Sequence, residues 1–286
     1  MRHARHTRDL SIVNCCACAL VAYFCTVPFH EFLHLVTHLA YGNGIVWYSA
    51  GAVQPLDRID YLALSYFDRI MVAGGSASIV NALIGVVLFF VLVRARLRPT
   101  ARVFLTQLMG GQLAQGIGYF LIGGLFGMGD WGNVCSSFPD DPGFATTLRV
   151  ILAVVGAVGI VATFFALNHL SYHFIEDQHD RGSRLYVALR LHLVMFLTGV
   201  VVGPLSMVRS PMMLTGELSP LLVACYSLMW IPFFWGFMFT WVMVRPPRRT
   251  RYRYPLPKAP VWPLVALSLA LTLVILLVFG PGIRLG

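Results

Sequence analysis

The feature that most constrains this chain is its series of apolar runs, each close to the length needed to cross a lipid bilayer. The 286 residues are 58% hydrophobic and only 12% charged, and about 20 consecutive apolar residues suffice for a helix to span the hydrocarbon core. The candidate spans fall at about 11–41, 70–93, 103–128, 147–169, 186–208, 219–244 and 261–281. The sequence therefore predicts an all-α, polytopic membrane helix bundle of about seven transmembrane helices.

The connectors between these runs predict the domain organisation and the orientation. Their basic residues are concentrated in the N-terminal tail, at 94–102 and at 245–258, within a chain of net charge +9. Positive connectors stay on the cytoplasmic side, so we expect a multi-pass protein of the cell membrane with a cytoplasmic N-terminus. This clustering does not form the basic face that nucleic-acid binding needs. No connector is long enough for a soluble domain, so residues 1–286 are expected to form a single integral membrane domain.

The first apolar segment contains "TVPFHEFLHLVTHLAYG" at 26–42, in which His30, Glu31 and His34 form an H-E-x-x-H motif. Residues four apart project from one face of a helix, so the two imidazoles can bind one zinc ion. The intervening glutamate can then act as general base toward a metal-bound water. This pattern predicts a Zn²⁺ site with His30 and His34 as ligands and Glu31 as the catalytic base.

The membrane setting strengthens this interpretation. Glu31 is the only acidic residue inside any of the apolar segments, and a charge there costs at least about 2.5 kcal/mol unless it is paired or metal-bound. His38 continues the series, but it would lie about 12 Å from His30 along a straight helix, too far to share one tetrahedral ion. The segment is also longer than the bilayer core, so it must tilt, kink near Pro28 or protrude.

A zinc hydrolase usually has three protein ligands, so one more is needed. Asp130 follows the third span in "GGLFGMGDWGNV" and is expected at the same membrane depth as the histidines, because the first and third spans run in the same direction. Taken alone, Asp130 reads as an ordinary turn residue. Asp57 in "QPLDR" is a competing candidate in a short charged connector.

Three stretches resemble the site-2-protease-like (M50) family of intramembrane zinc metalloproteases. They are "HEFLH" at 30–34, the small-residue and asparagine-bearing "AGGSASIVNALIG" at 73–85, and "GDWGN" at 129–133. The resemblance covers roughly residues 20 to 140. It implies His30, His34 and Asp130 as metal ligands, Glu31 as base, and Asn81 as a possible polar contact.

The resemblance also implies an activity, the hydrolysis of a peptide bond within or next to the membrane. The expected substrate is a membrane protein or a membrane-associated peptide. Residues from about 10 to 145 would form the metalloprotease-like core, and those from about 146 to 286 additional transmembrane helices. The sequence makes no prediction of the oligomeric state.

Other features of the sequence allow two further interpretations. His169 and His173 are also four apart, which is typical of the histidine boxes of membrane di-iron enzymes, but they are predicted near the opposite membrane face from the first cluster. The alternative function is a non-proteolytic membrane protein, either a metal-handling transporter or a catalytically inactive relative, because buried His and Glu can also line ion pathways.

Overall fold

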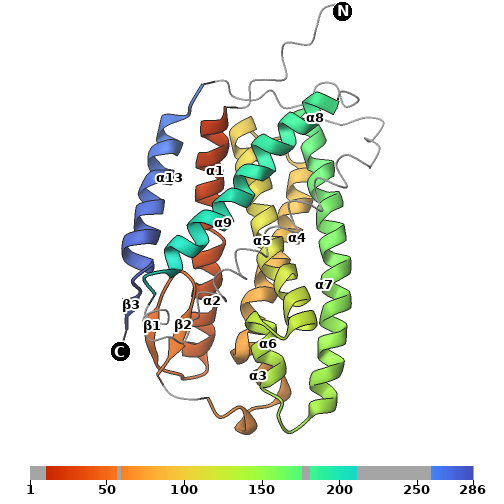
Figure 1. The fold of residues 1–286 in the computed structure, drawn as a ribbon, viewed down its shortest axis with the longest axis vertical. Coiled ribbons are helices and arrows are strands. Elements are labelled where there is room, and N and C mark those ends of the chain that lie inside the picture. The colour runs from red at the N-terminus through yellow and green to blue at the C-terminus, as the bar shows by residue number, and fades with distance from the viewer. Residues whose placement is uncertain (1–10, 57–58, 176–180, 211–258, 286) are drawn as a thin grey trace, which may run out of the picture.

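The computed structural model describes residues 11–56, 59–175, 181–210 and 259–285, which form a bundle of long helices with a small sheet at one end (Figure 1). The α-helices are α1 (Ile12–Phe24), α2 (Val27–Ala40), α3 (Tyr66–Ile70), α4 (Ser76–Arg94), α5 (Pro99–Phe126), α6 (Gly129–Ser136), α7 (Pro142–Ser171), α8 (Arg181–Ala188), α9 (Val194–Met207) and α13 (Trp262–Val274). Two short segments are 3₁₀-helices, η1 (Tyr61–Ala63) and η3 (Tyr172–Phe174). Three are π-helical turns, η2 (Met71–Gly75), η4 (Leu189–Leu193) and η5 (Ile275–Phe279). The strands are β1 (Ile45–Tyr48), β2 (Val53–Pro55) and β3 (Ile283–Arg284).

Five helical segments in the described part of the chain are long and apolar enough to cross a membrane. They are Ile12–Ala40, Tyr66–Arg94, Pro142–Phe174, Arg184–Met207 and Trp262–Phe279. The mainly helical, multi-pass architecture is therefore as expected. The predicted span at 103–128 corresponds to helix α5, which is not among the five, and the predicted span at 219–244 lies outside the described residues. The count of seven stays a prediction.

The first span is broken into two helices. Helix α1 ends at Phe24 and α2 begins at Val27, with Pro28 in the first turn of α2 and the Thr26 hydroxyl donating to the Ala22 carbonyl at 2.7 Å. Proline fits the first turn of a helix because its missing N–H has no intrahelical partner there. Of the three ways to accommodate the long first segment, the chain thus shows a kink next to Pro28, and α2 continues as a separate helix that carries the histidines.

Helix α5 is the central element of the bundle and packs against α4, α7 and α1. Glycines allow close approach on both sides. A Cβ atom added at Gly116 would lie 2.5 Å from the backbone nitrogen of Ala82 in α4, and one added at Gly156 in α7 would lie 2.5 Å from the backbone nitrogen of Leu121. Small residues at such contacts let transmembrane helices pack backbone to backbone.

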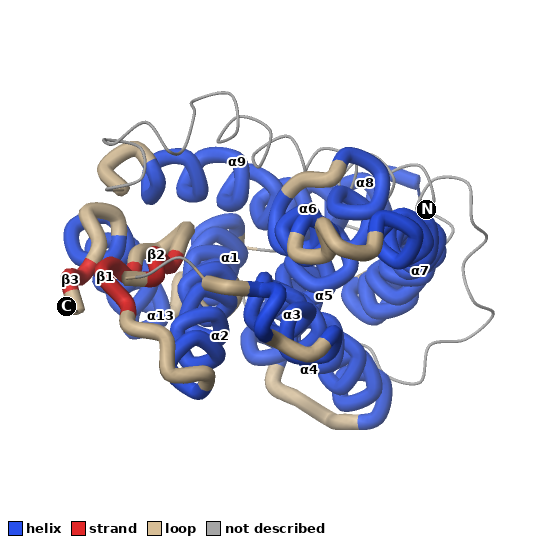
Figure 2. Tube along the Cα trace, turned by 90° about the horizontal axis from the view of Figure 1, so that it is seen from below, coloured by secondary structure: helices blue, strands red, loops and turns tan. Residues whose placement is uncertain are grey.

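In the described part of the chain, a three-stranded sheet departs from the all-α expectation. Strand β1 is central, with β2 and β3 antiparallel on either side. In the view from this end of the bundle, α2 lies between the sheet and the α3–α4 helix (Figure 2). The Tyr48 hydroxyl of β1 donates to the Pro28 carbonyl at 2.8 Å, so the sheet braces the first turn of α2.

We expect Gly116→Ala to destabilise the bundle, because the added methyl group meets backbone atoms of α4 that cannot rotate away. Overpacking of this kind typically costs about 1–3 kcal/mol. The measurement is the thermal unfolding midpoint of the purified protein in detergent.

Gly110→Ala is the matched control on the same helix, since a Cβ atom there would find only a Leu167 methyl group at 3.5 Å, an ordinary contact. Alanine is also the better helix former, so the control should unfold at or above the wild-type temperature. Equal midpoints for the two variants would contradict the packing argument.

Candidate metal centre

His30 and His34 project from the same face of α2, one turn apart. Their ring centroids are 4.8 Å apart, with the rings nearly perpendicular, and their Nε2 atoms lie 3.3 Å from each other. The pairing follows from helical periodicity, because residues at i and i+4 are neighbours on the helix surface. Both side chains thus direct the same ring nitrogen to one point.

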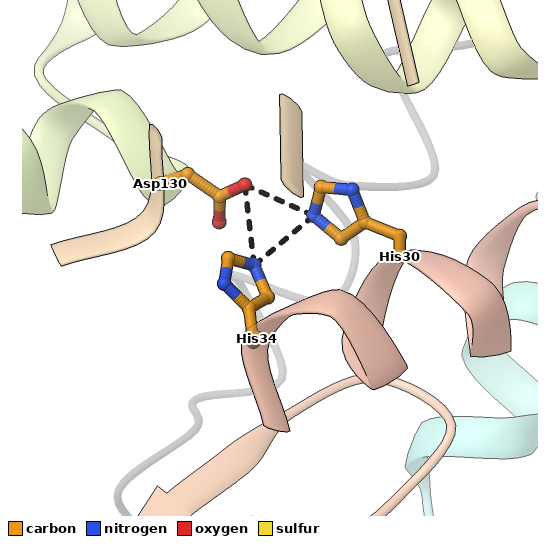
Figure 3. Close-up of side chains that lie close together, drawn as sticks. All are labelled: His30, His34 and Asp130. Atoms are coloured by element: carbon orange, nitrogen blue, oxygen red, sulfur yellow. Dashed lines mark hydrogen bonds and ion pairs between the residues drawn. The ribbon is translucent and has the colours of Figure 1, made fainter. Parts of the chain in front are cut away.

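Asp130 reaches that point from a different element. Helix α5 ends in a left-handed cap at Gly127 (φ 64°), and Gly129 (φ 66°) turns the chain into α6, which carries Asp130 in its first turn. Its Oδ2 atom lies 2.9 Å from His30 Nε2 and 3.4 Å from His34 Nε2 (Figure 3). One potential ligand atom from each of the three residues lies within 4.8 Å of the others. Segments about a hundred residues apart therefore meet at a single site.

Helix α4 holds Asp130 in place by close approach and by a hydrogen bond. Just before α4, Gly74 adopts φ 136°, a conformation that favours glycine, and a Cβ atom there would lie 2.8 Å from the Asp130 Cβ. One turn later, Ser78 Oγ donates to Asp130 Oδ2 at 2.9 Å. The turn at Gly74 thus lets α6 approach, and Ser78 fixes the carboxylate direction.

His30 is the more deeply buried of the two histidines. It is 1% exposed, its Nδ1 lies 3.0 Å from Asn81 Oδ1, and its ring stacks on Tyr119 with centroids 5.1 Å apart and an interplanar angle of 7°. A histidine that ligates a metal commonly uses its second nitrogen in this way, which fixes the orientation of the ring.

The three converging atoms need a hydrogen or a metal cation between them. A carboxylate oxygen is an acceptor only, and a neutral imidazole carries a single N–H, so three such atoms within hydrogen-bond distance repel unless a proton or a metal cation lies between them. Two imidazole nitrogens and one carboxylate oxygen are the ligand types that zinc takes in catalytic sites. The residues present therefore fit a zinc ion.

Glu31 is buried beside the group and is 7% exposed. It is close enough to interact electrostatically with His30, His34 and Asp130. Within the part of the chain that the structure describes, its carboxylate makes no hydrogen bond. An acceptor left free next to a cation-binding group is what a general base requires.

At the same end of the bundle, Arg69 joins α3 to the segment after α6. Its guanidinium donates to the backbone carbonyls of Leu64 and Ser137 and pairs with Asp140, whose carboxyl pKa it holds below the usual value. Because Ser137 directly follows α6, this contact holds the helix that carries Asp130 against the α3–α4 helix.

The other sequence candidates lie apart from this group. His38 is buried but belongs to the C-terminal end of α2, where Asn43 contacts it. Among the described residues, His30, His34 and Asp130 form the one group with metal-ligand spacing, and neither His169 nor His173 belongs to it. Asp57 lies outside the described residues. Ser78 was expected only to contribute to close helix packing, and its hydrogen bond to Asp130 was not predicted. Gln112 and Tyr119 were not among the candidates, although a glutamine within an apolar run is a signal that could have been followed.

Comparison of the chain with protein-family models, with curated proteins and with solved structures found no match.

Proposed function

We propose that this protein is an intramembrane zinc metallopeptidase of the site-2-protease-like (M50) type. His30, His34 and Asp130 would hold the zinc ion, and Glu31 would act as general base. The observation that carries the proposal is the convergence of three ligand atoms, from α2 and α6, beside a buried glutamate.

The number and type of ligands support catalysis rather than a structural role. Structural zinc sites are closed by four protein ligands, whereas catalytic sites use three and leave one position for water or substrate. The described residues supply three. The neighbouring Glu31 supplies the further group that hydrolysis needs.

The chemistry divides between the metal and the protein. A zinc ion, when bound, supplies a Lewis acid that polarises a carbonyl oxygen and increases the acidity of water. Glu31 accepts the proton of the attacking water and delivers it to the leaving amine, so the carboxylate is regenerated at the end of the reaction. Ser78 keeps the Asp130 carboxylate directed at the histidines throughout.

The position of the site favours a substrate that lies in or at the membrane. The face of α2 away from the site carries Phe32, Val36 and Leu39, which are 45%, 44% and 56% exposed. Apolar side chains exposed on a span of bilayer length are typical of a lipid-facing helix surface. The proposed substrate is accordingly a membrane protein or a membrane-associated peptide, cleaved within or next to the bilayer.

The proposal includes a topology. With seven spans and a cytoplasmic N-terminus in the cell membrane, the metal site would lie toward the outer face, because α1 and α2 run outward from the arginine-bearing tail. The arginine-rich segment 245–258 would lie on the cytoplasmic side.

We predict that the purified protein binds about one zinc ion per chain and that His34→Ala and Asp130→Ala each reduce this to a small fraction, because each removes one of three ligands. Metal content is measured by elemental analysis after dialysis in detergent. His38→Ala is the matched control, since it removes a histidine of the same helix that lies outside the group. Zinc that persists at full stoichiometry in Asp130→Ala would refute the ligand assignment.

We further predict that Glu31→Gln retains zinc but loses peptidase activity by about 10²- to 10⁴-fold, the contribution typical of a general base. Cleavage of single-span membrane proteins reconstituted with the enzyme is followed by gel electrophoresis and mass spectrometry.

The zinc content of Glu31→Gln serves as the control, because equal metal in the two proteins separates loss of the base from loss of the site. If the wild type and Glu31→Gln process every candidate equally, the non-proteolytic alternative, a metal-handling transporter or an inactive relative, is favoured instead.

A further inference from the structure

A chain of buried hydrogen bonds leads from the break in the first span to His30. It begins at the backbone carbonyl of Cys25, which accepts from Gln112 Nε2 at 2.9 Å. Gln112 Oε1 accepts from Asn81 Nδ2, and Asn81 Oδ1 lies 3.0 Å from His30 Nδ1. Asn81 and Gln112 are 0% and 2% exposed, so both amide side chains are buried.

The Cys25 carbonyl determines which group donates in each of these hydrogen bonds. A backbone carbonyl can only accept, so the end of the Gln112 side chain that faces Cys25 must be the NH₂ group. The other end is then the oxygen, which can only accept from the Asn81 NH₂ group. Asn81 must therefore present its own oxygen to His30, and His30 Nδ1 must carry a hydrogen.

These hydrogen bonds therefore place a hydrogen on His30 Nδ1. A neutral imidazole carries one N–H, and with that hydrogen on Nδ1 the lone pair is on Nε2, the atom that faces Asp130 and His34. The other neutral tautomer would place an N–H toward Asp130 and satisfy the carboxylate without any metal. The chain of hydrogen bonds disfavours that arrangement.

We propose that Gln112 and Asn81 are positioning residues that hold His30 in the tautomer able to bind a metal ion. The Cys25 carbonyl sets the orientation of Gln112, because it can only accept a hydrogen bond. This inference rests on the proposed metal site, and it assigns roles to two residues that do not touch the ion. Partners of this kind typically contribute about 10- to 100-fold to metal affinity.

Helix α5 provides a matched control for the experiment. Gln107, also buried, donates its Nε2 to the backbone carbonyls of Cys15 and Leu191 at 3.3 and 3.0 Å. Like Gln112, it ties α5 to a carbonyl of the first span, but it has no connection to His30. Gln107→Met and Gln112→Met therefore remove similar structural contacts, and only the second interrupts the path to the metal site.

The prediction concerns zinc affinity, measured by competition with a chelator at constant pH. We expect Gln112→Met to bind zinc about 10- to 100-fold more weakly than the wild type, and Gln107→Met to bind it with nearly wild-type affinity. Gln112 acts only through Asn81, so Asn81→Leu combined with Gln112→Met should bind no more weakly than Asn81→Leu alone, a non-additive result. Equal affinities for the two glutamine variants, or additive effects in the double variant, would overturn the proposal.

A second readout keeps this inference separate from the proposed function. Nitrogen-15 NMR of histidine-labelled, metal-free protein reports which ring nitrogen of His30 carries the hydrogen, with the signal assigned by its loss in His30→Ala. His30 Nδ1 is expected to carry a hydrogen in every molecule of the wild type and of Gln107→Met, whether or not Nε2 is also protonated, and in only part of the molecules of Gln112→Met. A wild type that fails to bind zinc but shows this pattern would refute the metallopeptidase and leave the positioning role supported. A wild type whose His30 carries a hydrogen on Nε2 and none on Nδ1 would refute the positioning role whether or not zinc binds.

Discussion

The contact on which the rest of this structure depends is that of the Asp130 carboxylate with the two imidazoles of α2. In a bundle whose outer surface is apolar, an unpaired carboxylate costs several kcal/mol, so the elements around it must be arranged to satisfy it. Gly74 removes the side chain that would keep α6 away, and Ser78 supplies a hydroxyl that turns the carboxylate toward the histidines. The turn before α4 and the glycines before α6 are understandable only together with this contact.

Helix α5 combines close packing with hydrogen bonds to neighbouring helices. Close helix packing needs small residues, whereas a polar site needs long side chains that carry hydrogen bonds from one helix to another. Gly116 is placed where the α4 backbone approaches, and Gln107 and Gln112 are placed where they donate to carbonyls of the first span. Those glutamines make α5 more polar than α1, α4 and α7, even though it is the most extensively packed of the described helices.

The sequence predicted the helical, multi-pass character and the grouping of His30, His34 and Asp130, because both depend on simple periodicities. Bilayer length identifies spans, a spacing of four places two histidines on one face, and alternating direction places the end of the third span at their level. The contributions of Ser78, Gln112 and Tyr119 could not be predicted in this way, since they depend on how far α4 and α5 rotate about their own axes. The small sheet was missed because its strands are only two to four residues long, too short for an alternating pattern to be recognised.

The break at Cys25 and Thr26 connects the membrane constraint to the chemistry of the site. In an uninterrupted helix the Cys25 carbonyl would accept from the N–H of the residue four positions later, and the break removes that partner. A carbonyl without a partner is too costly to leave within the bilayer, so a break at this position requires a donor from another helix. Gln112 supplies it, and in doing so its own oxygen is directed to Asn81. The bend that fits a long first segment into the membrane therefore also determines which nitrogen of His30 is available to a cation, and neither feature can be changed without affecting the other.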